Sequence, residues 1–366
     1  MVLFIQDHIV IKNKIIVKVI FFSVFIFLFN ACRIIELQKL ISKQEINFVH
    51  NYQNIDIVNN RLITLDNNLM FCLDLGGPNC IFKSKIEKFN IIDSLNVGVL
   101  IKANAKKIPN KIVVIDDIKT DFFSINNAIF RVIPDILFCQ NIMGIIGPEL
   151  FMKKSLILNF KENKLEISEI TPNLNGYTEL KVINFDGYYY NIEILLNNQP
   201  ISVKFDTGNS HELLLTMNET DHLSTKKDYF YYINSENKID SNSISQDLFS
   251  FSKSKVDHNI STILYKNGKR NLLGMGIIKK YNWILDYKNG KIYCQNISKN
   301  NEDFNKNKFT IKDNKLVLIQ SDKLNSKYLN KIVIEANNTI INENNVCDFY
   351  LLLNSKNSPN KITFQK

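Results

Sequence analysis

Apolar residues in this chain occur mostly in short runs or in alternation with polar residues, a pattern typical of β-strands. In residues 189–205, two alternating runs flank a turn at Asn197–Pro200, which predicts a β-hairpin. Phenylalanine and tyrosine are abundant and favour strands further. Alanine-rich stretches with helical spacing are nearly absent, so a helical bundle is not expected. The pattern predicts an all-β protein.

Two segments with the same pattern occur in each half of the chain. Gly147–Lys164 and Gly274–Lys291 match at an offset of 127 positions, and each reads as a β-hairpin with Asn or Gly at its turn. Upstream of them, Leu69–Phe82 resembles Ser202–Leu215. Because related motifs recur in the same order with similar gaps, an internal repeat is expected.

The repeat divides the chain into five parts. We expect a leader at 1–31, a tether at 32–50, a first half at 51–172, a second half at 173–298 and a tail at 299–366. The tail holds three runs typical of strands, at residues 316–320, 331–336 and 348–353. These runs predict added strands or a small extra module, and they indicate no role for it.

The leader has the features of an export signal. Three lysines precede an apolar run at residues 19–29, which is followed by Asn30, Ala31 and Cys32. The run is shorter than the roughly 20 residues of a membrane span, although a count from residue 11 reaches that length. An uncleaved membrane anchor is therefore the alternative. The cysteine after Ala31 resembles the lipobox of bacterial lipoproteins, which implies a lipid on Cys32 and a place in the bacterial cell envelope.

Charge and cysteine content exclude some classes of site. The net charge is +9, but the lysines are dispersed and form no basic stripe with interleaved aromatic residues, so nucleic-acid binding is not expected. No two cysteines have the close spacing of zinc ligands, so a metal site is not expected. We expect buried free thiols, and a disulfide between Cys72 and Cys80 is the alternative.

The clearest motif is Asp206-Thr207-Gly208, which follows an alternating strand and precedes an apolar one. Together with Ser210, it resembles the DTGxS signature of aspartic peptidases, the family of pepsins and retropepsins. The glycine-containing segments Ile142–Gly147 and Asn271–Gly276 resemble the second motif of that family. The resemblance covers residues 52–298 and implies a bilobal double β-barrel with a cleft between two related halves.

In the first half, the corresponding motif is Asp74-Leu75-Gly76. The resemblance implies that Asp74 and Asp206 face each other and share a proton, since two adjacent carboxylates do not both ionise readily. One carboxylate then activates a water while the other protonates the substrate carbonyl. Gly76 and Gly208 permit tight turns, and in the family the hydroxyl of a residue such as Thr207 cross-links the two loops.

Leu75 departs from the family pattern, because it has no hydroxyl to make the reciprocal cross-link. The sequence predicts an aspartic endopeptidase that cleaves peptides or proteins without a cofactor, as a monomer attached to the membrane by its lipid. An inactive relative that binds peptides or envelope partners is the first alternative. A homodimer that pairs two Asp206 motifs, as in retropepsins, is the second, and a purely structural lipoprotein is the third. Substrate-covering hairpins are expected at 97–114 or 229–240.

Overall fold

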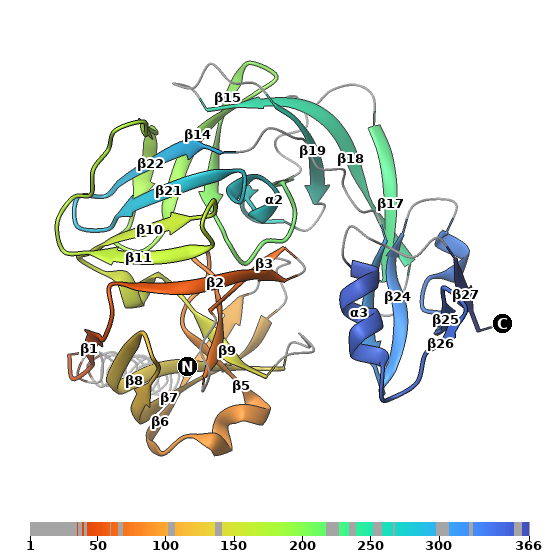
Figure 1. The fold of residues 1–366 in the computed structure, drawn as a ribbon, viewed down its shortest axis with the longest axis horizontal. Coiled ribbons are helices and arrows are strands. Elements are labelled where there is room, and N and C mark those ends of the chain that lie inside the picture. Colours follow the sequence, from red (N-terminus) through yellow and green to blue (C-terminus); the bar gives the residue numbers. More distant parts are fainter. Residues whose placement is uncertain are drawn as a thin grey trace, which may run out of the picture.

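A computed structural model describes most of the chain (Figure 1). The described residues are 35, 39, 42–58, 60–64, 69–101, 107–135, 141–216, 227–233, 239–251, 258–265, 268–297, 307–321, 325–354 and 361–365. The leader and the lipidation residue Cys32 lie outside them, so those assignments remain predictions. Among the described residues, no helix is long and apolar enough to cross a membrane.

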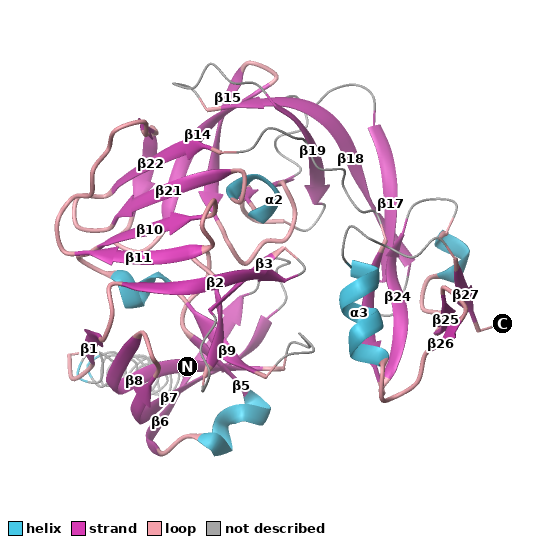
Figure 2. Ribbon diagram, in the orientation of Figure 1, coloured by secondary structure: helices cyan, strands magenta, loops and turns pink. Residues whose placement is uncertain are grey.

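The described part of the first half is built almost entirely of strands (Figure 2). They are β1 (Glu45–Phe48), β2 (Tyr52–Val58), β3 (Arg61–Thr64), β4 (Met70–Leu73), β5 (Cys80–Phe82), β6 (Ile91–Ile101), β7 (Lys107–Lys119), β8 (Phe123–Ile133), β9 (Ile142–Ile146), β10 (Ser155–Asn159) and β11 (Lys164–Ser168). Two 3-10 helices, η1 (Lys83–Lys88) and η2 (Pro148–Phe151), join them. Strand β1 pairs with β8, so the folded part begins inside the segment expected to be a tether.

The second half follows with the same kind of elements. Its strands are β12 (Thr178–Glu179), β13 (Val182–Phe185), β14 (Tyr190–Leu196), β15 (Gln199–Phe205), β16 (Leu213–Thr216), β17 (Lys227–Ile233), β18 (Ile239–Ser250), β19 (His258–Tyr265), β20 (Leu272–Leu273), β21 (Tyr281–Asp286) and β22 (Lys291–Asn296), with the short helix α2 (Met275–Ile278). The predicted hairpin is confirmed, because β14 pairs with β15 around Asn197 and Asn198, both at positive φ.

The two halves share one topology. In the first, β4 runs parallel to β9, and β5 pairs antiparallel with β9 and parallel with β8. In the second, β15 runs parallel to β20, and β16 pairs antiparallel with β20 and parallel with β19. Each half therefore places the strand that ends at an aspartate directly beside a strand from the glycine-containing motif. This equivalence is the structural form of the sequence repeat.

The closing hairpins of the two halves join in one sheet, and Figure 1 shows β22, β21, β10 and β11 side by side at the left. Strands β10 and β21 pair antiparallel, with Ile157 directly opposite Ile284. These two residues differ by the repeat offset of 127 and are thus equivalent. The closing strands of the two halves therefore pair with equivalent residues opposite each other.

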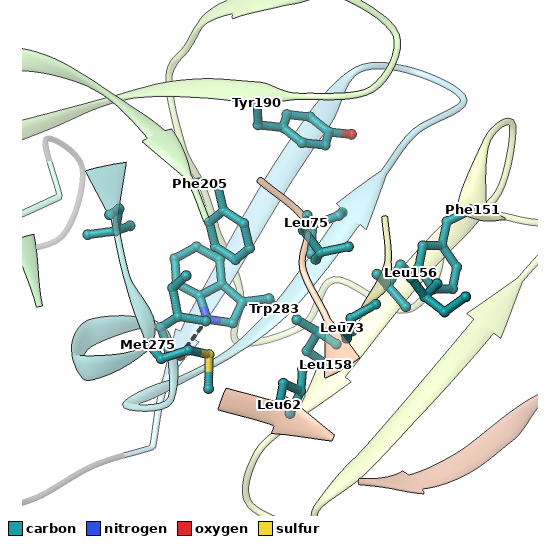
Figure 3. Packing of buried hydrophobic residues seen from close by; sticks show 14 of the residues in the cluster. Leu62, Leu73, Leu75, Phe151, Leu156, Leu158, Tyr190, Phe205, Met275 and Trp283 are labelled. Atoms are coloured by element: carbon teal, nitrogen blue, oxygen red, sulfur yellow. Dashed lines mark hydrogen bonds between the residues drawn. The ribbon is translucent and has the colours of Figure 1, made fainter. Parts of the chain in front are cut away.

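Hydrophobic residues from both halves form one continuous core. Leu75, Phe205 and Trp283 belong to it and are at most 2% exposed. Phe205 contacts Trp283 edge-to-face, and the Trp283 indole donates a hydrogen bond to Ile278 O, drawn dashed in Figure 3. The loops that carry Asp74 and Asp206 therefore begin from buried, well-packed strands.

The tail forms a module beside β17, at the right of Figure 1. Its elements are β23 (Lys308–Lys312), β24 (Lys315–Ser321), η4 (Ser326–Tyr328), β25 (Val333–Ala336), β26 (Thr339–Ile340), α3 (Val346–Asn354) and β27 (Ile362–Phe364). Strand β24 pairs with β17 of the second half, and β25, β26 and β27 form a separate sheet.

One expectation for the tail was wrong, because residues 348–353 are helical and belong to α3. Val346 and Leu353 are buried in a cluster with residues of β23 and β24, and Phe349 and Tyr350 pack against it. These four positions have helical spacing and form one apolar face. A continuous apolar run does not by itself distinguish a strand from a helix, which explains the error.

Candidate functional site

The loops of the two Asp-x-Gly motifs are held in equivalent ways. The amide of Asp74 donates to Ile146 O at 2.9 Å, and the amide of Asp206 donates to Leu273 O at 3.0 Å. Within each loop, the glycine amide donates to the aspartate Oδ1 at 2.9 Å, from Gly76 in the first half and from Gly208 in the second. Both aspartates are thus oriented by the backbone and remain partly exposed.

Each glycine lies directly against the carboxyl group of the other half. A Cβ on Gly76 would be 2.3 Å from Asp206 Cγ, and a Cβ on Gly208 would be 2.3 Å from Asp74 Cγ. No side chain fits in either space, so both positions require glycine to let the loops approach. The structure therefore brings Asp74 and Asp206 together, as the resemblance implied.

The proximity of the two carboxyl groups perturbs the titration of Asp206. The pKa of Asp206 lies well above its usual value, chiefly because the surrounding protein desolvates the carboxyl group. The negative charge of Asp74 and a side-chain hydrogen bond with it act in the same direction, whereas Lys204 and the Gly208 amide oppose the shift. A carboxyl pair of this kind holds one proton between its members over a range of pH.

Beneath the carboxyl groups, Thr207 joins the two loops. Its fully buried Oγ1 accepts a hydrogen bond from Leu75 N at 2.8 Å and donates one to Leu73 O at 2.9 Å. The reciprocal bonds are impossible because Leu75 has no hydroxyl. Its side chain is instead part of the hydrophobic core, close to Leu73 and Phe205 in Figure 3.

Lys204 makes a second connection between the loops, which sequence reasoning missed. Its ammonium group donates to Gly76 O at 2.6 Å and lies 3.6 Å from the centre of the Tyr189 ring. Only 6% of the residue is exposed. The one signal in the sequence was a lysine inside the apolar strand that leads into Asp206.

Asn79 and Glu149 connect the first loop with the glycine-containing motif. Asn79 Oδ1 accepts from Gly147 N at 2.7 Å, and Asn79 N donates to Glu149 Oε2 at 3.3 Å. Burial raises the pKa of Glu149 to about 7, and the charge of Asp74 adds to the effect. A carboxyl group with a pKa near neutrality therefore lies beside the loop that carries Asp74.

Ser210, a predicted supporting residue, does not contact either aspartate through an observed hydrogen bond. It and His211 contact Lys308 from the tail, whose Nζ lies 3.2 Å from Ser210 Oγ and 3.0 Å from His211 Nε2. Burial lowers the pKa of Lys308 to about 7. Asn60 Nδ2 also donates to Ser210 O at 3.1 Å. The tail therefore packs against the loop that follows Asp206.

Near this loop, Glu212 and Lys280 form a buried ion pair with an Oε1–Nζ distance of 2.8 Å. Glu212 Oε2 also accepts a hydrogen bond from Ser261 N at 2.7 Å. The amide of Gly274 donates to Glu212 O, and the amide of Gly276 donates to His211 O. These bonds tie the glycine motif of the second half to the strand after Asp206.

The other predictions about residue chemistry can be compared directly. Cys72, Cys80 and Cys294 are buried free thiols, so no Cys72–Cys80 disulfide forms. Cys347 is disulfide-bonded, so the expectation of free thiols was wrong for that residue. The hairpins expected at 97–114 and 229–240 are formed by β6 with β7 and by β17 with β18. Their tips lie outside the described residues. In the part of the chain that the structure describes, no group of three or more His, Cys, Asp or Glu residues has metal-binding geometry.

Comparisons with known proteins extend this picture only slightly. No protein-family model matches the sequence, and no curated protein matches it either. The solved structures that are similar to the chain include three that match at low TM-scores.

A retropepsin-like aspartic protease from Rickettsia conorii is 18% identical, with coverage of 32% of this chain and 90% of that one, at a TM-score of 0.27. Basic 7S globulin from soybean is 10% identical over 69% of this chain and 96% of its own, at a TM-score of 0.39. The protein edgp is 9% identical over 68% of this chain and 96% of its own, at a TM-score of 0.41. At these scores, only the geometry of the site supports an argument about function.

Proposed function

We propose that this chain is an aspartic endopeptidase that hydrolyses peptide bonds with a water activated by Asp74 and Asp206. The observation that carries the proposal is the direct contact of the two loops, in which each glycine lies against the carboxyl group of the opposite half. The surrounding fold would be the bilobal double β-barrel of this family, with the substrate in a cleft between the halves.

The chemistry follows from a shared proton. The ionised member of the pair takes a proton from water as the water attacks the peptide carbonyl, and the protonated member donates to the carbonyl oxygen. The raised pKa of Asp206 keeps the pair singly protonated to higher pH than isolated carboxyl groups would allow. No covalent intermediate and no cofactor are needed.

Both aspartates come from one chain, which supports a monomer as the active form. Cleavage of a mixed peptide library between acidic and neutral pH tests this proposal with wild type, Asp206→Asn and Asp74→Asn. Activity lost in both variants is the expected result. Activity that survives in Asp74→Asn but not in Asp206→Asn would instead favour a homodimer of Asp206 motifs.

A second candidate function is favoured by Leu75. An inactive peptidase-like protein that binds peptides or envelope partners needs the fold and the site without an efficient pair of acids. Folded wild-type protein that binds library peptides but cleaves none at any pH would establish that function and exclude the first.

We also propose that the protein is attached to the bacterial envelope by a lipid on Cys32. The support is the basic and apolar leader that ends at Ala31. Incorporation of labelled fatty acid into wild type but not into Cys32→Ser is the expected result. Equal labelling of both proteins, or of neither, would exclude this attachment.

A further inference from the structure

A lysine lies in an unusual place, beside the proposed pair of acids. Lys204 is on β15, two residues before Asp206, and its ammonium group reaches across to Gly76 O of the other half at 2.6 Å. Lys204 is only 6% exposed, so it cannot serve as a surface contact for a substrate. Burial of a lone ammonium group is costly unless it is compensated by hydrogen bonds and opposite charges.

The compensation for Lys204 comes from the site itself. One of its three donors is used by Gly76 O, and the Tyr189 ring lies 3.6 Å from its nitrogen. Asp206 and Asp74 stabilise its positive charge. The charged and titratable groups that face it are Asp206 on its own segment, Asp74 on the opposite loop, Arg270 before β20, and Asp186 and Tyr189 before β14.

The geometry points to Lys204 as a positioning residue that fixes the first aspartate loop and sets the pH range of the acid pair. This inference rests on the proposed function and identifies a determinant of it. Thr207 supplies a hydroxyl cross-link from the second half to the first, and Leu75 cannot return it. The bond from Lys204 to Gly76 O also joins the second half to the first loop, one residue beyond Leu75. Lys204 therefore gives the first loop a second, charged connection to the second half.

The charge has a consequence that a neutral cross-link would not have. A positive group beside two carboxyl groups favours their ionised forms. It opposes the effect of burial on Asp206. The acid pair should therefore begin to work at lower pH than it would without the lysine, and removal of the charge should shift its titration to higher pH.

The test is a titration of the Asp206 carboxyl carbon by 13C NMR, assigned by its loss in Asp206→Asn. We expect Lys204→Met to move the titration to higher pH and Lys204→Arg, which keeps charge and donors, to leave it near the wild-type position. Lys164→Met is the matched control, because Lys164 is a more exposed lysine of β11 that pairs with Glu162. Its titration should match wild type. If Lys204→Met does not fold, Lys204→Gln serves as the uncharged variant.

The second readout is peptide cleavage across pH by the same proteins. Lys204→Met should lower kcat about tenfold through misplacement of Asp74 and shift the pH optimum upward, with KM nearly unchanged. An unchanged titration in Lys204→Met, or an equal shift in Lys204→Arg, would overturn the inference. If no variant cleaves peptides but the titration moves as expected, the proposed function fails and the role of Lys204 in setting the acid pair stands.

Discussion

The strongest energetic prediction concerns the Thr207 hydroxyl. Thr207→Val keeps the shape of the side chain but removes both hydrogen bonds between the halves, to Leu75 N and Leu73 O. The loss of these two hydrogen bonds at buried backbone groups costs about 1–3 kcal/mol for each bond. The extra methyl group recovers about 1 kcal/mol at a fully buried position. We therefore expect the free energy of unfolding to fall by about 3 kcal/mol.

Urea unfolding provides the assay, because Trp283 is the only tryptophan and is fully buried beside Phe205. Its fluorescence reports directly on the core beneath the site. Thr207→Ser is the control, since it keeps the hydroxyl and loses only a methyl group, for about 1 kcal/mol. If Thr207→Val is as stable as Thr207→Ser, the two hydrogen bonds do not hold the loops together and the reasoning is wrong.

Four further predictions use the same unfolding assay. Glu212→Gln should lower the free energy of unfolding by about 3–5 kcal/mol, because the buried Lys280 loses its charged partner. The double variant with Lys280→Met should recover part of this loss. A Glu212→Gln protein of wild-type stability would contradict the prediction. Leu75→Thr should lower the free energy of unfolding by about 2 kcal/mol, because Leu75 packs in the core. A variant more stable than wild type would show that a hydroxyl at this position contributes more than the packing of the leucine. The pKa of Asp206 is raised in the folded state, so the folded protein loses stability as the pH rises above the ordinary value of 3.8. The stability of Asp206→Asn relative to wild type should therefore increase as the pH rises from 3.8. A difference that does not change with pH would show that the titration of Asp206 is not linked to folding. The pKa of Lys308 is about 7 in the folded protein, against an ordinary value of 10.5. Wild type should therefore gain stability relative to Lys308→Met as the pH rises from about 7 to 10.5. A stability difference that does not change with pH would show that the lysine is solvated.

Much of the fold was predictable because its signals are local. The turn at Asn197 and Asn198 needs positive φ, which asparagine tolerates, and the flanking alternation specifies the strands. The repeat was visible because each half needs the same glycines at the same contacts. Gly76 and Gly208 show this most clearly, since a side chain at either would collide with an aspartate.

The remaining features of the site depend on contacts between distant segments. Nothing local to Lys308 indicates that it reaches Ser210, 98 positions away, because its strand β23 is joined to the second half only through the pairing of β24 with β17. The ion pair of Glu212 and Lys280 joins positions 68 apart in the same way. Residue types identify such groups as candidates, but only the register of the sheets decides which ones meet.

The same distinction bears on Leu75, the strongest sequence argument against activity. From the sequence alone, Leu75 stands where the second half has Thr207, so one of two symmetric hydroxyl cross-links is missing. In the folded chain the arrangement is not symmetric, because Lys204 donates to Gly76 O from the half that already supplies Thr207. Both connections therefore run from the second half to the first, and the first loop contributes only acceptors, an amide and a hydrophobic side chain. A loop held in this way needs no hydroxyl of its own to keep Asp74 in place, so Leu75 is compatible with a working pair of acids.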